Sequence, residues 1–252
     1  INKMQIKLFQ FLKNVMSQLG RLAPFLRGLT ELSIFKSDTL KKAVVLLSGS
    51  GSNFQAILDS ITADEIDLEI SSVISNVPGV RGIDRAKTHG IPTHIINNHD
   101  YSERISFDKA LLDKVVKYDP DYLILAGFMR ILSSEFIKKF NKPIFNIHPS
   151  LLPKYKGLNT HQRVLDNNEK LHGCSVHLVT KELDAGPLII QGEVPVKNDD
   201  DIKKLAARVL KVEHMIYKKA LNLFITNQIT YENLKLMKIN KEIEIPVMVR
   251  MN

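Results

Sequence analysis

The sequence predicts an α/β fold, with a mostly parallel, twisted sheet and helices on both of its faces. Apolar, β-branched runs such as KAVVLLS, residues 42–48, are typical of strands that are buried on both sides. Each such run is followed by a segment whose apolar residues recur at helical spacing, as in SNFQAILDSI. Repeated strand–helix units of this kind indicate a doubly wound sheet with right-handed crossovers.

The alternation continues along the chain as far as Pro153. The expected strands after the first are LEISSVIS, PTHIIN, YLILAG and PIFNI, and the expected helices between them are GVRGIDRAKTHG, FDKALLDKVVKYD and SSEFIKKF. Beyond Pro153, the strand-like runs GCSVHLV and PLIIQGEVPV predict an antiparallel C-terminal part of the sheet. A long amphipathic helix from about Asp201 to Phe224 then closes the domain.

The length and composition suit one large domain with appendages. The chain has 252 residues, of which 44% are hydrophobic and 25% are charged. We expect a single domain over residues 41–230 and a strand-like tail over residues 231–252, to which we assign no function. Residues 1–40 form a basic, acid-poor extension with helical spacing. It is compatible with a transit peptide or with a helix that docks on a membrane surface or a partner, but we favour upstream sequence outside the working protein.

The composition also disfavours several classes of protein. The single cysteine, Cys174, excludes an internal disulfide and a cysteine-based zinc site. It indicates a reducing compartment, which is the cytoplasm, or an organelle matrix if residues 1–40 are a transit peptide. The net charge of +8 favours acidic partners such as phosphorylated metabolites. The lysines are scattered and not interleaved with aromatic residues, so no nucleic-acid partner is expected. No membrane partner is expected either, because no apolar run reaches the roughly 18 residues of a span.

The segment SGSGSN, residues 48–53, follows the first expected strand. In an open parallel sheet, ligands bind beyond the carboxyl ends of the strands. Consecutive backbone N–H groups at the start of the next helix favour an anion there, and a single phosphate is the natural ligand. The segment is not a P-loop, because no Gly-Lys-Ser/Thr follows, and Phe54 stands where the dinucleotide fingerprint needs its third glycine. The alternative is an ordinary turn capped by Ser or Asn.

Asn146 and His148 lie two positions apart at the end of the last expected parallel strand, so their side chains point to the same side of the sheet. An amide donor and an imidazole in one place suit a reaction in which a carbonyl becomes a tetrahedral oxyanion. His148 needs a carboxylate to raise its pKa, and Asp184 in the downstream loop KELDAGP is the candidate. A core histidine and a turn aspartate are the structural alternatives.

Six co-linear motifs give the chain a resemblance to a known family. The motifs are VVLLSGSGSNFQAI, LILAGFMRIL, NIHPSLLPKYKGL, GCSVHLV, ELDAGP and VEHMIY, and they span about residues 41–227. Together they resemble the folate-dependent phosphoribosylglycinamide formyltransferases. The Asn-x-His, the proline-bracketed loop and the later Asp are shared by folate formyltransferases and hydrolases, whereas the glycine-serine loop points to this family.

The resemblance implies a Rossmann-like formyltransferase fold and a function. The formyl group of the co-substrate 10-formyltetrahydrofolate would pass to the amine of glycinamide ribonucleotide in purine biosynthesis, by direct attack and without a metal. Asn146 and His148 would stabilise the tetrahedral oxyanion, His148 would pass a proton to the leaving folate nitrogen, and Asp184 would keep His148 protonated.

The resemblance also implies binding residues. Those implied for the ribonucleotide are Gly51, Ser52 and Asn53 at its phosphate and Glu213 at its sugar. Those implied for the folate are Arg85, Met129, Arg130, Ile131, Leu132, Asn146, Thr180, Lys181, Glu182, Leu183 and Asp184.

Two positions depart from the family pattern. Lys156 stands where the family has Pro, and Asn159 where His is expected, which affects loop ordering or affinity more than activity.

Three alternatives to this function remain. A methionyl-tRNA formyltransferase would need a C-terminal RNA-binding domain, and a formyltetrahydrofolate hydrolase an N-terminal regulatory domain; the residues outside 41–230 are too few for either. The third alternative is a non-catalytic nucleotide-binding module. A monomer and a homodimer are both compatible with the sequence.

Overall fold

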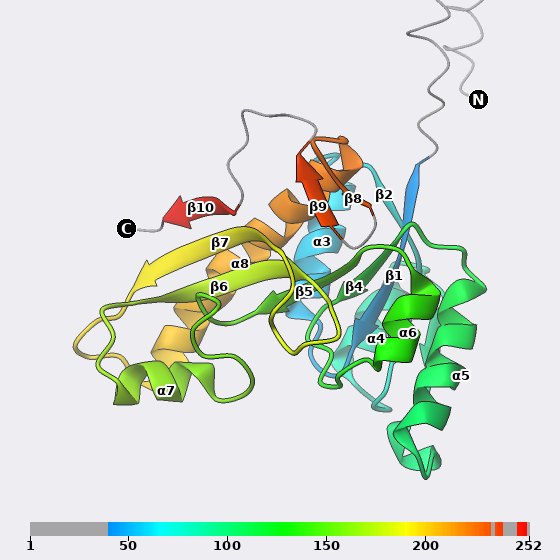
Figure 1. Ribbon diagram of the computed structural model, residues 1–252, viewed down its shortest axis with the longest axis horizontal. Coiled ribbons are helices and arrows are strands. Elements are labelled where there is room, and N and C mark those ends of the chain that lie inside the picture. The colour runs from blue at the N-terminus through cyan, green and yellow to red at the C-terminus, as the bar shows by residue number, and fades with distance from the viewer. Residues whose placement is uncertain (1–39, 233–234, 239–245, 251–252) are drawn as a thin grey trace, which may run out of the picture. The chain divides into compact units, whose positions relative to one another are not determined.

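The computed structural model describes residues 40–232, 235–238 and 246–250 (Figure 1). The strands are β1 (Lys41–Leu47), β2 (Leu68–Ser75), β3 (Thr93–Ile95), β4 (Tyr122–Leu125), β5 (Ile144–His148), β6 (Leu171–Leu178), β7 (Leu188–Pro195), β8 (Ile229–Glu232), β9 (Lys235–Lys238) and β10 (Val247–Arg250). The helices are α3 (Ser52–Thr62), α4 (Arg81–Thr88), the 3₁₀ helix η2 (Asn98–Asp100), α5 (Arg104–Val116), α6 (Ser134–Phe140), α7 (Thr160–Asp166) and α8 (Ile202–Ile225).

One eight-stranded sheet organises the domain, in the order β10-β7-β6-β5-β4-β1-β2-β3. The neighbours from β3 to β5 all pair in parallel, and β6 pairs antiparallel with both β5 and β7. This arrangement confirms the predicted parallel sheet with an antiparallel C-terminal part. The order places β1, β4 and β5 side by side, so the loops that follow these three strands lie at one edge of the sheet.

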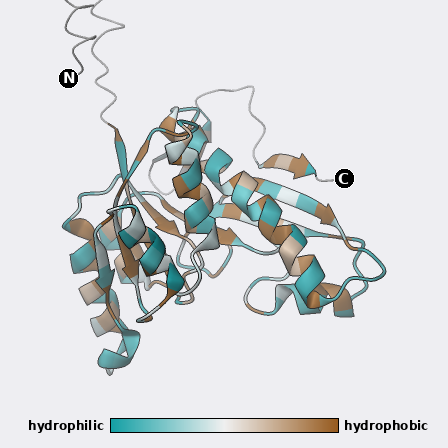
Figure 2. Cartoon of the chain, turned by 180° about the vertical axis from the view of Figure 1, so that it is seen from behind, coloured by the Kyte–Doolittle hydropathy of each residue, from teal (hydrophilic) through white to brown (hydrophobic). Residues whose placement is uncertain are grey.

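Helices cover both faces of the sheet, as predicted, and β1 shows why. Its alternate residues Ala43, Val45 and Leu47 belong to a core that includes α3, α4 and α8, whereas Val44 and Leu46 face a second core with α5 and α6. All five side chains are fully buried. Such a strand has no polar face, which explains its continuous apolar run. Figure 2 shows polar and apolar residues alternating around the helices.

Some elements were not expected from the sequence. The short helix α7 lies where only strand-like rhythm was predicted; it has just two buried residues, Thr160 and Val164, so its sequence carries little periodicity. In the tail, β8 and β9 form a separate hairpin, and β10 pairs in parallel with β7. The described part of the tail therefore contains strands, and β8 extends across the expected boundary at residue 230.

Residues 1–39, with the expected extension, lie outside the described residues. The compact unit begins at Leu40. Within the described ranges, every helix is too short or too polar to span a lipid bilayer.

Candidate active site

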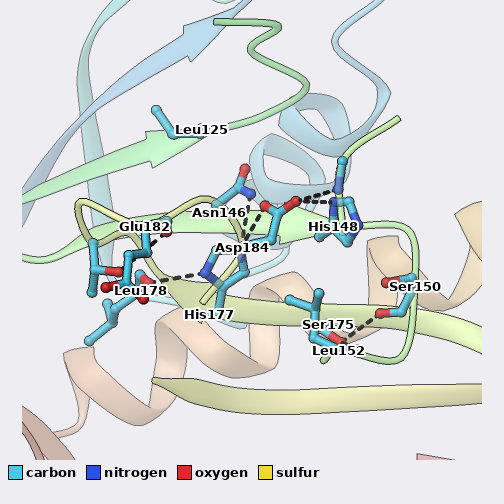
Figure 3. Close-up of polar contacts among 12 residues, drawn as sticks. Leu125, Asn146, His148, Ser150, Leu152, Ser175, His177, Leu178, Glu182 and Asp184 are labelled. Carbon is cyan, nitrogen blue, oxygen red and sulfur yellow. Dashed lines mark hydrogen bonds and ion pairs between the residues drawn. The ribbon is translucent and has the colours of Figure 1, made fainter. Parts of the chain in front are cut away.

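Four polar side chains meet at the end of β5 (Figure 3). Asn146 and His148 come from β5, His177 from β6, and Asp184 from the loop before β7. Nδ1 of His148 lies 3.4 Å from Oδ2 of Asp184, and Nε2 of His177 lies 3.7 Å from Oδ1 of the same carboxylate. Nδ2 of Asn146 lies 3.1 Å from Nε2 of His177. The structure therefore brings together the three side chains that the sequence singled out, and it buries His148 and Asp184 almost completely.

His177 is the member of this cluster that sequence reasoning missed. It sits directly opposite Asn146 in the antiparallel register of β5 and β6. The segment GCSVHLV does place His177 between two apolar residues, Val176 and Leu178, as in a strand with one polar and one apolar face. Without the register, however, the sequence does not show which face of β6 meets the polar face of β5.

The hydrogen bonds of His177 orient the amide of Asn146. Nδ1 of His177 lies 3.0 Å from the carbonyl oxygen of Leu178, so this nitrogen carries a hydrogen and Nε2 is left to accept from the Asn146 amide. Within the described part of the chain, the second hydrogen of that amide makes no hydrogen bond. The amide nitrogen is thus fixed in place with one donor available for a ligand oxygen.

Burial and neighbouring groups together set the protonation of His148. Burial lowers the pKa of His148, and the Tyr155 carbonyl and the Asp184 carboxylate oppose this shift without reversing it. Burial raises the pKa of Asp184, but the hydrogen bond from the N–H of Gly157 and the charge of His148 oppose burial, and the pKa lies below its usual value. Asp184 therefore acts in the expected direction but does not cancel the effect of burial, and its role of keeping His148 protonated stays a prediction. Asp184 can still stabilise the imidazolium when one forms.

A buried polar network fixes the loop that follows His148. The hydroxyl of Ser175 donates to the carbonyl of Ser150 at 2.6 Å and accepts from the N–H of Leu152 at 3.0 Å. The amide of Gln191 donates to the carbonyl of Leu152 at 2.8 Å and to the Ser175 hydroxyl at 2.9 Å. Farther along, the N–H of Gly157 donates to Oδ2 of Asp184 at 2.9 Å. The loop therefore holds both the strand end and the carboxylate.

The two positions that depart from the family pattern lie in the next part of this loop. Lys156 is exposed, and its carbonyl accepts a hydrogen bond from Arg163 at 2.7 Å. Asn159 has a left-handed backbone and begins α7 without a side-chain cap. An asparagine suits that conformation, because it tolerates positive φ better than most residues.

The glycine-serine segment forms a tight turn into α3. Gly51 caps the helix with a positive φ of 67° and no side-chain cap, so the alternative of a Ser or Asn cap is wrong. A Cβ on Gly51 would lie 2.8 Å from the Cα of Gly82 on α4, which leaves room for glycine alone. The hydroxyl of Ser48 accepts from the N–H of Met129 at 2.8 Å and so joins this turn to the loop after β4.

Asn53 and Glu213 form a buried pair beside this turn. Nδ2 of Asn53 lies 2.7 Å from Oε2 of Glu213, and Oδ1 of Asn53 is buried without a hydrogen-bond partner in the described part of the chain. Burial raises the pKa of Glu213, and the hydrogen bond from Asn53 opposes that shift. One turn farther along α8, the hydroxyl of Tyr217 donates to the carbonyls of Leu125 at 2.9 Å and Phe145 at 3.1 Å. One face of α8 thus runs past the ends of β4 and β5 to the glycine turn.

Part of the predicted folate set is exposed beside the cluster. Met129 is 72% exposed, Ile131 52% and Leu183 47%, so their apolar surface is accessible to a ligand. Leu132, by contrast, belongs to the core, and the Arg130 guanidinium packs 4.8 Å from the centre of the Phe107 ring. The remaining residues, Thr180, Lys181 and Glu182, lie with Leu183 in the loop that carries Asp184.

Arg85 lies beside the glycine turn, and its expected contact with the folate stays a prediction. Arg85 donates to the carbonyl of Ser50 at 2.9 Å and to the side chain of Gln55 at 2.7 Å, so it supports the glycine turn. The guanidinium that reaches the segment 129–132 is that of Arg104, which donates to the carbonyl of Ile131. Arg104 was not singled out from the sequence, because it stands alone at the start of α5 without a motif.

Within the described ranges, no cluster of His, Cys, Asp and Glu side chains could hold a metal ion. The absence of a metal from the reaction remains a prediction.

Comparison with known proteins agrees with this geometry. The family model described as formyl transferase matches residues 41–221. A phosphoribosylglycinamide formyltransferase from Escherichia coli K12 is 45% identical over 181 residues, which cover 72% of this chain and 85% of that protein. The human trifunctional purine biosynthetic protein adenosine-3 is 42% identical over 202 residues, 80% of this chain. The chain spans only 20% of that relative's length.

The fold agrees as well. The crystallised phosphoribosylglycinamide formyltransferase from Coxiella burnetii superposes with a TM-score of 0.77 at 41% identity, covering 84% of this chain and 99% of that one. The residues matched by the family model, 41–221, include Asn146, His148 and Asp184. The chain therefore belongs to the formyl transferase family and, within it, to the phosphoribosylglycinamide formyltransferases.

Proposed function

We propose that the protein transfers the formyl group of 10-formyltetrahydrofolate to the amine of glycinamide ribonucleotide, a step of purine biosynthesis. The observation that carries the proposal is the meeting of Asn146, His148 and Asp184 at the sheet edge where the glycine turn also lies. An oxyanion and a phosphate could be held there at the same time. The names of the matched relatives support the choice of substrates.

The hydrogen-bond donors of this cluster suit each step of formyl transfer. The neutral amine of the ribonucleotide attacks the formyl carbon, and the carbonyl oxygen becomes an oxyanion. The free amide hydrogen of Asn146 and an N–H of His148 donate to that oxygen, whose charge they stabilise in a buried site. The carbon–nitrogen bond to the folate then breaks; the folate nitrogen gains a proton through His148, and the attacking amine loses one. Asp184 stabilises the imidazolium while this transfer takes place.

The binding of the two substrates is assigned to separate parts of the edge. The N–H groups of Gly51, Ser52 and Asn53 at the start of α3 suit the phosphate. Glu213, which Asn53 holds in place, suits the sugar hydroxyls as a hydrogen-bond acceptor. The exposed apolar side chains of Met129, Ile131 and Leu183 suit the folate, with the loop 180–184 beside them. We keep Arg85 in the proposed folate set and add Arg104, because Arg104 contacts the carbonyl of Ile131.

The remaining proposals concern the partners of the protein and its cellular compartment. We infer that the partners are these two small molecules, with no nucleic acid, membrane or metal, and that the protein works as a monomer or homodimer. The buried, reduced Cys174 is compatible with the cytoplasm or an organelle matrix.

A steady-state assay with both substrates tests the function. We expect deformylated folate to form only when glycinamide ribonucleotide is present. Folate deformylation without the ribonucleotide would indicate a hydrolase, and no turnover with either mixture would favour the non-catalytic alternative.

A further inference from the structure

Both ring nitrogens of His148 are engaged by the protein itself. Nδ1 faces Asp184, and Nε2 lies 2.9 Å from the carbonyl oxygen of Tyr155. A carbonyl oxygen only accepts, so Nε2 carries a hydrogen that points at Tyr155. If the proposed function holds, His148 must offer an N–H to the substrate, and the Nδ1 side belongs to Asp184. The Nε2 hydrogen is therefore the one required, and Tyr155 occupies it.

We infer that the Tyr155 carbonyl is a latch on His148, which it occupies in the ligand-free chain and must release before formyl transfer. The inference rests on the proposed function for its catalytic consequence only. The hydrogen bond that defines the latch is a property of the chain without substrates.

The loop is built from a base and a tip that are held by different contacts. The base, through Leu152, is tied to β6 and β7 by the buried hydroxyl of Ser175 and the buried amide of Gln191. The tip, residues 153–157, is held partly at the surface, where the hydroxyl of Tyr155 donates to Oε1 of Glu169 at 2.8 Å and Nζ of Lys154 lies 3.0 Å from the same oxygen. Two further hydrogen bonds hold it from inside: Ser150 donates to the Lys154 carbonyl at 2.7 Å, and the N–H of Gly157 donates to Asp184. Movement of the tip therefore breaks some of these bonds but can leave those of Ser175 and Gln191 to the base intact.

The tip also has space behind it and a strained backbone. A cavity of about 640 Å³ is lined by Lys154 and Tyr155 of the tip and by Glu169 and His172, from the turn before β6 and the start of β6. Tyr155 has a positive φ of 56°, which is unfavourable for a residue with an aromatic side chain. Both features favour a tip that can change conformation when a ligand competes for His148.

Several titratable or charged groups face His148 and affect its pKa. Asp184 approaches from the loop before β7, His177 from β6 and Arg163 from α7. The carboxylate favours the charged imidazole, and the other two groups disfavour it. The Tyr155 carbonyl also favours the charged form, because it accepts from Nε2–H. Loss of the latch should therefore lower the pKa of His148.

Nitrogen-15 NMR of the histidine rings in the full chain tests the latch without substrates. The variant His148→Gln assigns the His148 signals. In the wild type, we expect Nε2 of His148 to carry the hydrogen above the pKa. In Tyr155→Phe and Glu169→Ala, which remove the anchor of the tip, we expect a lower His148 pKa and a mixture of the two tautomers. An Nδ1–H tautomer in the wild type would overturn the inference.

Kinetics of the same variants test the catalytic consequence. If the Tyr155 carbonyl holds Nε2 of His148 in most molecules, only a small fraction of the protein is ready for formyl transfer. Weakening the contact between Tyr155 and Glu169 should therefore raise kcat/KM by about twofold to fivefold through a lower KM. If the carbonyl instead positions His148 in the transition state, kcat falls tenfold or more with KM unchanged, and the latch is rejected. Glu135→Ala is the matched control, because it also removes a carboxylate from a surface ion pair, with Lys139 at 2.8 Å on α6, outside this loop; it should match the wild type in both experiments. An equal effect in Glu135→Ala would attribute the change to the loss of a surface carboxylate and reject the latch.

The two proposals fail in distinguishable ways. If the wild type transfers no formyl group, the proposed function is wrong, and the NMR result on His148 stands independently. If transfer occurs but His148 shows no bond from Nε2, only the latch is wrong.

Discussion

At the scale of single residues, His148 and Asp184 form the contact on which the proposed chemistry depends. We expect His148→Ala and Asp184→Ala each to lower kcat by about 10²-fold or more, the range typical of acid–base and oxyanion groups. The His148 variant loses the proton donor, and the Asp184 variant loses the carboxylate that stabilises the imidazolium. Steady-state kinetics with both substrates provide the measurement.

The exposed His89 at the end of α4 offers a control for this prediction. His89→Ala removes an imidazole from the surface, and its turnover should equal that of the wild type. Turnover near wild type in both His148→Ala and Asp184→Ala would reject the assigned roles.

His172 links burial to the pH dependence of stability. It is 1% exposed, and its Nε2 lies 2.9 Å from Nδ1 of His161. Burial lowers the pKa of His172 to about 4, whereas an unfolded histidine titrates near ~6.5. The unfolded chain therefore binds more protons between these values, so the free energy of unfolding falls as the pH drops through this window. At about 1.4 kcal/mol per pKa unit, His172 accounts for on the order of 3 kcal/mol.

Urea denaturation measures this dependence. The wild type should lose stability between about pH 7 and about pH 4.5, and His172→Gln should lose clearly less, because glutamine does not titrate. Equal losses in both proteins would show that His172 is not the group responsible.

At the scale of elements, α8 packs on β7 at a distance that only glycine permits. A Cβ on Gly192 would lie 2.2 Å from Cγ1 of Val212. We expect Gly192→Ala to lower the free energy of unfolding by about 1–3 kcal/mol, the usual cost of overpacking. Gly49→Ala is a suitable control, since its new methyl group would meet nothing within 4 Å. Denaturation curves that coincide for the two variants would contradict the packing argument.

The elements also differ in how far the sequence predicted them. Strands β1 and β4 were predicted because burial on both faces leaves an unbroken apolar run. Strands β2 and β5 were predicted from mostly apolar segments that polar residues interrupt. Helix α8 was predicted because it is long enough to show its periodicity. Helix α7 was not, because a seven-residue helix with two buried residues shows almost no period. The pairing of β10 with β7 was not predictable either, since nothing in VMVR specifies a parallel partner.

At the scale of the whole molecule, the compact unit and the family match begin together. The unit starts at Leu40, and the match to the formyl transferase model starts at residue 41. We therefore expect deletion of residues 1–40 to leave formyl transfer and the thermal midpoint unchanged. An inactive or unfolded truncated protein would show that the extension belongs to the working domain.

The sequence by itself determined the fold class and the identity of the main polar residues. Strand burial and helix periodicity are local patterns, and the Asn-x-His spacing places two side chains on one face whatever surrounds them. The tertiary structure decided how those residues act. The register of β5 and β6 set His177 opposite Asn146, and the loop brought the Tyr155 carbonyl to His148. Burial also outweighed Asp184 in setting the pKa of His148. Each of these depends on distances and desolvation between segments far apart in the chain, which no local pattern contains.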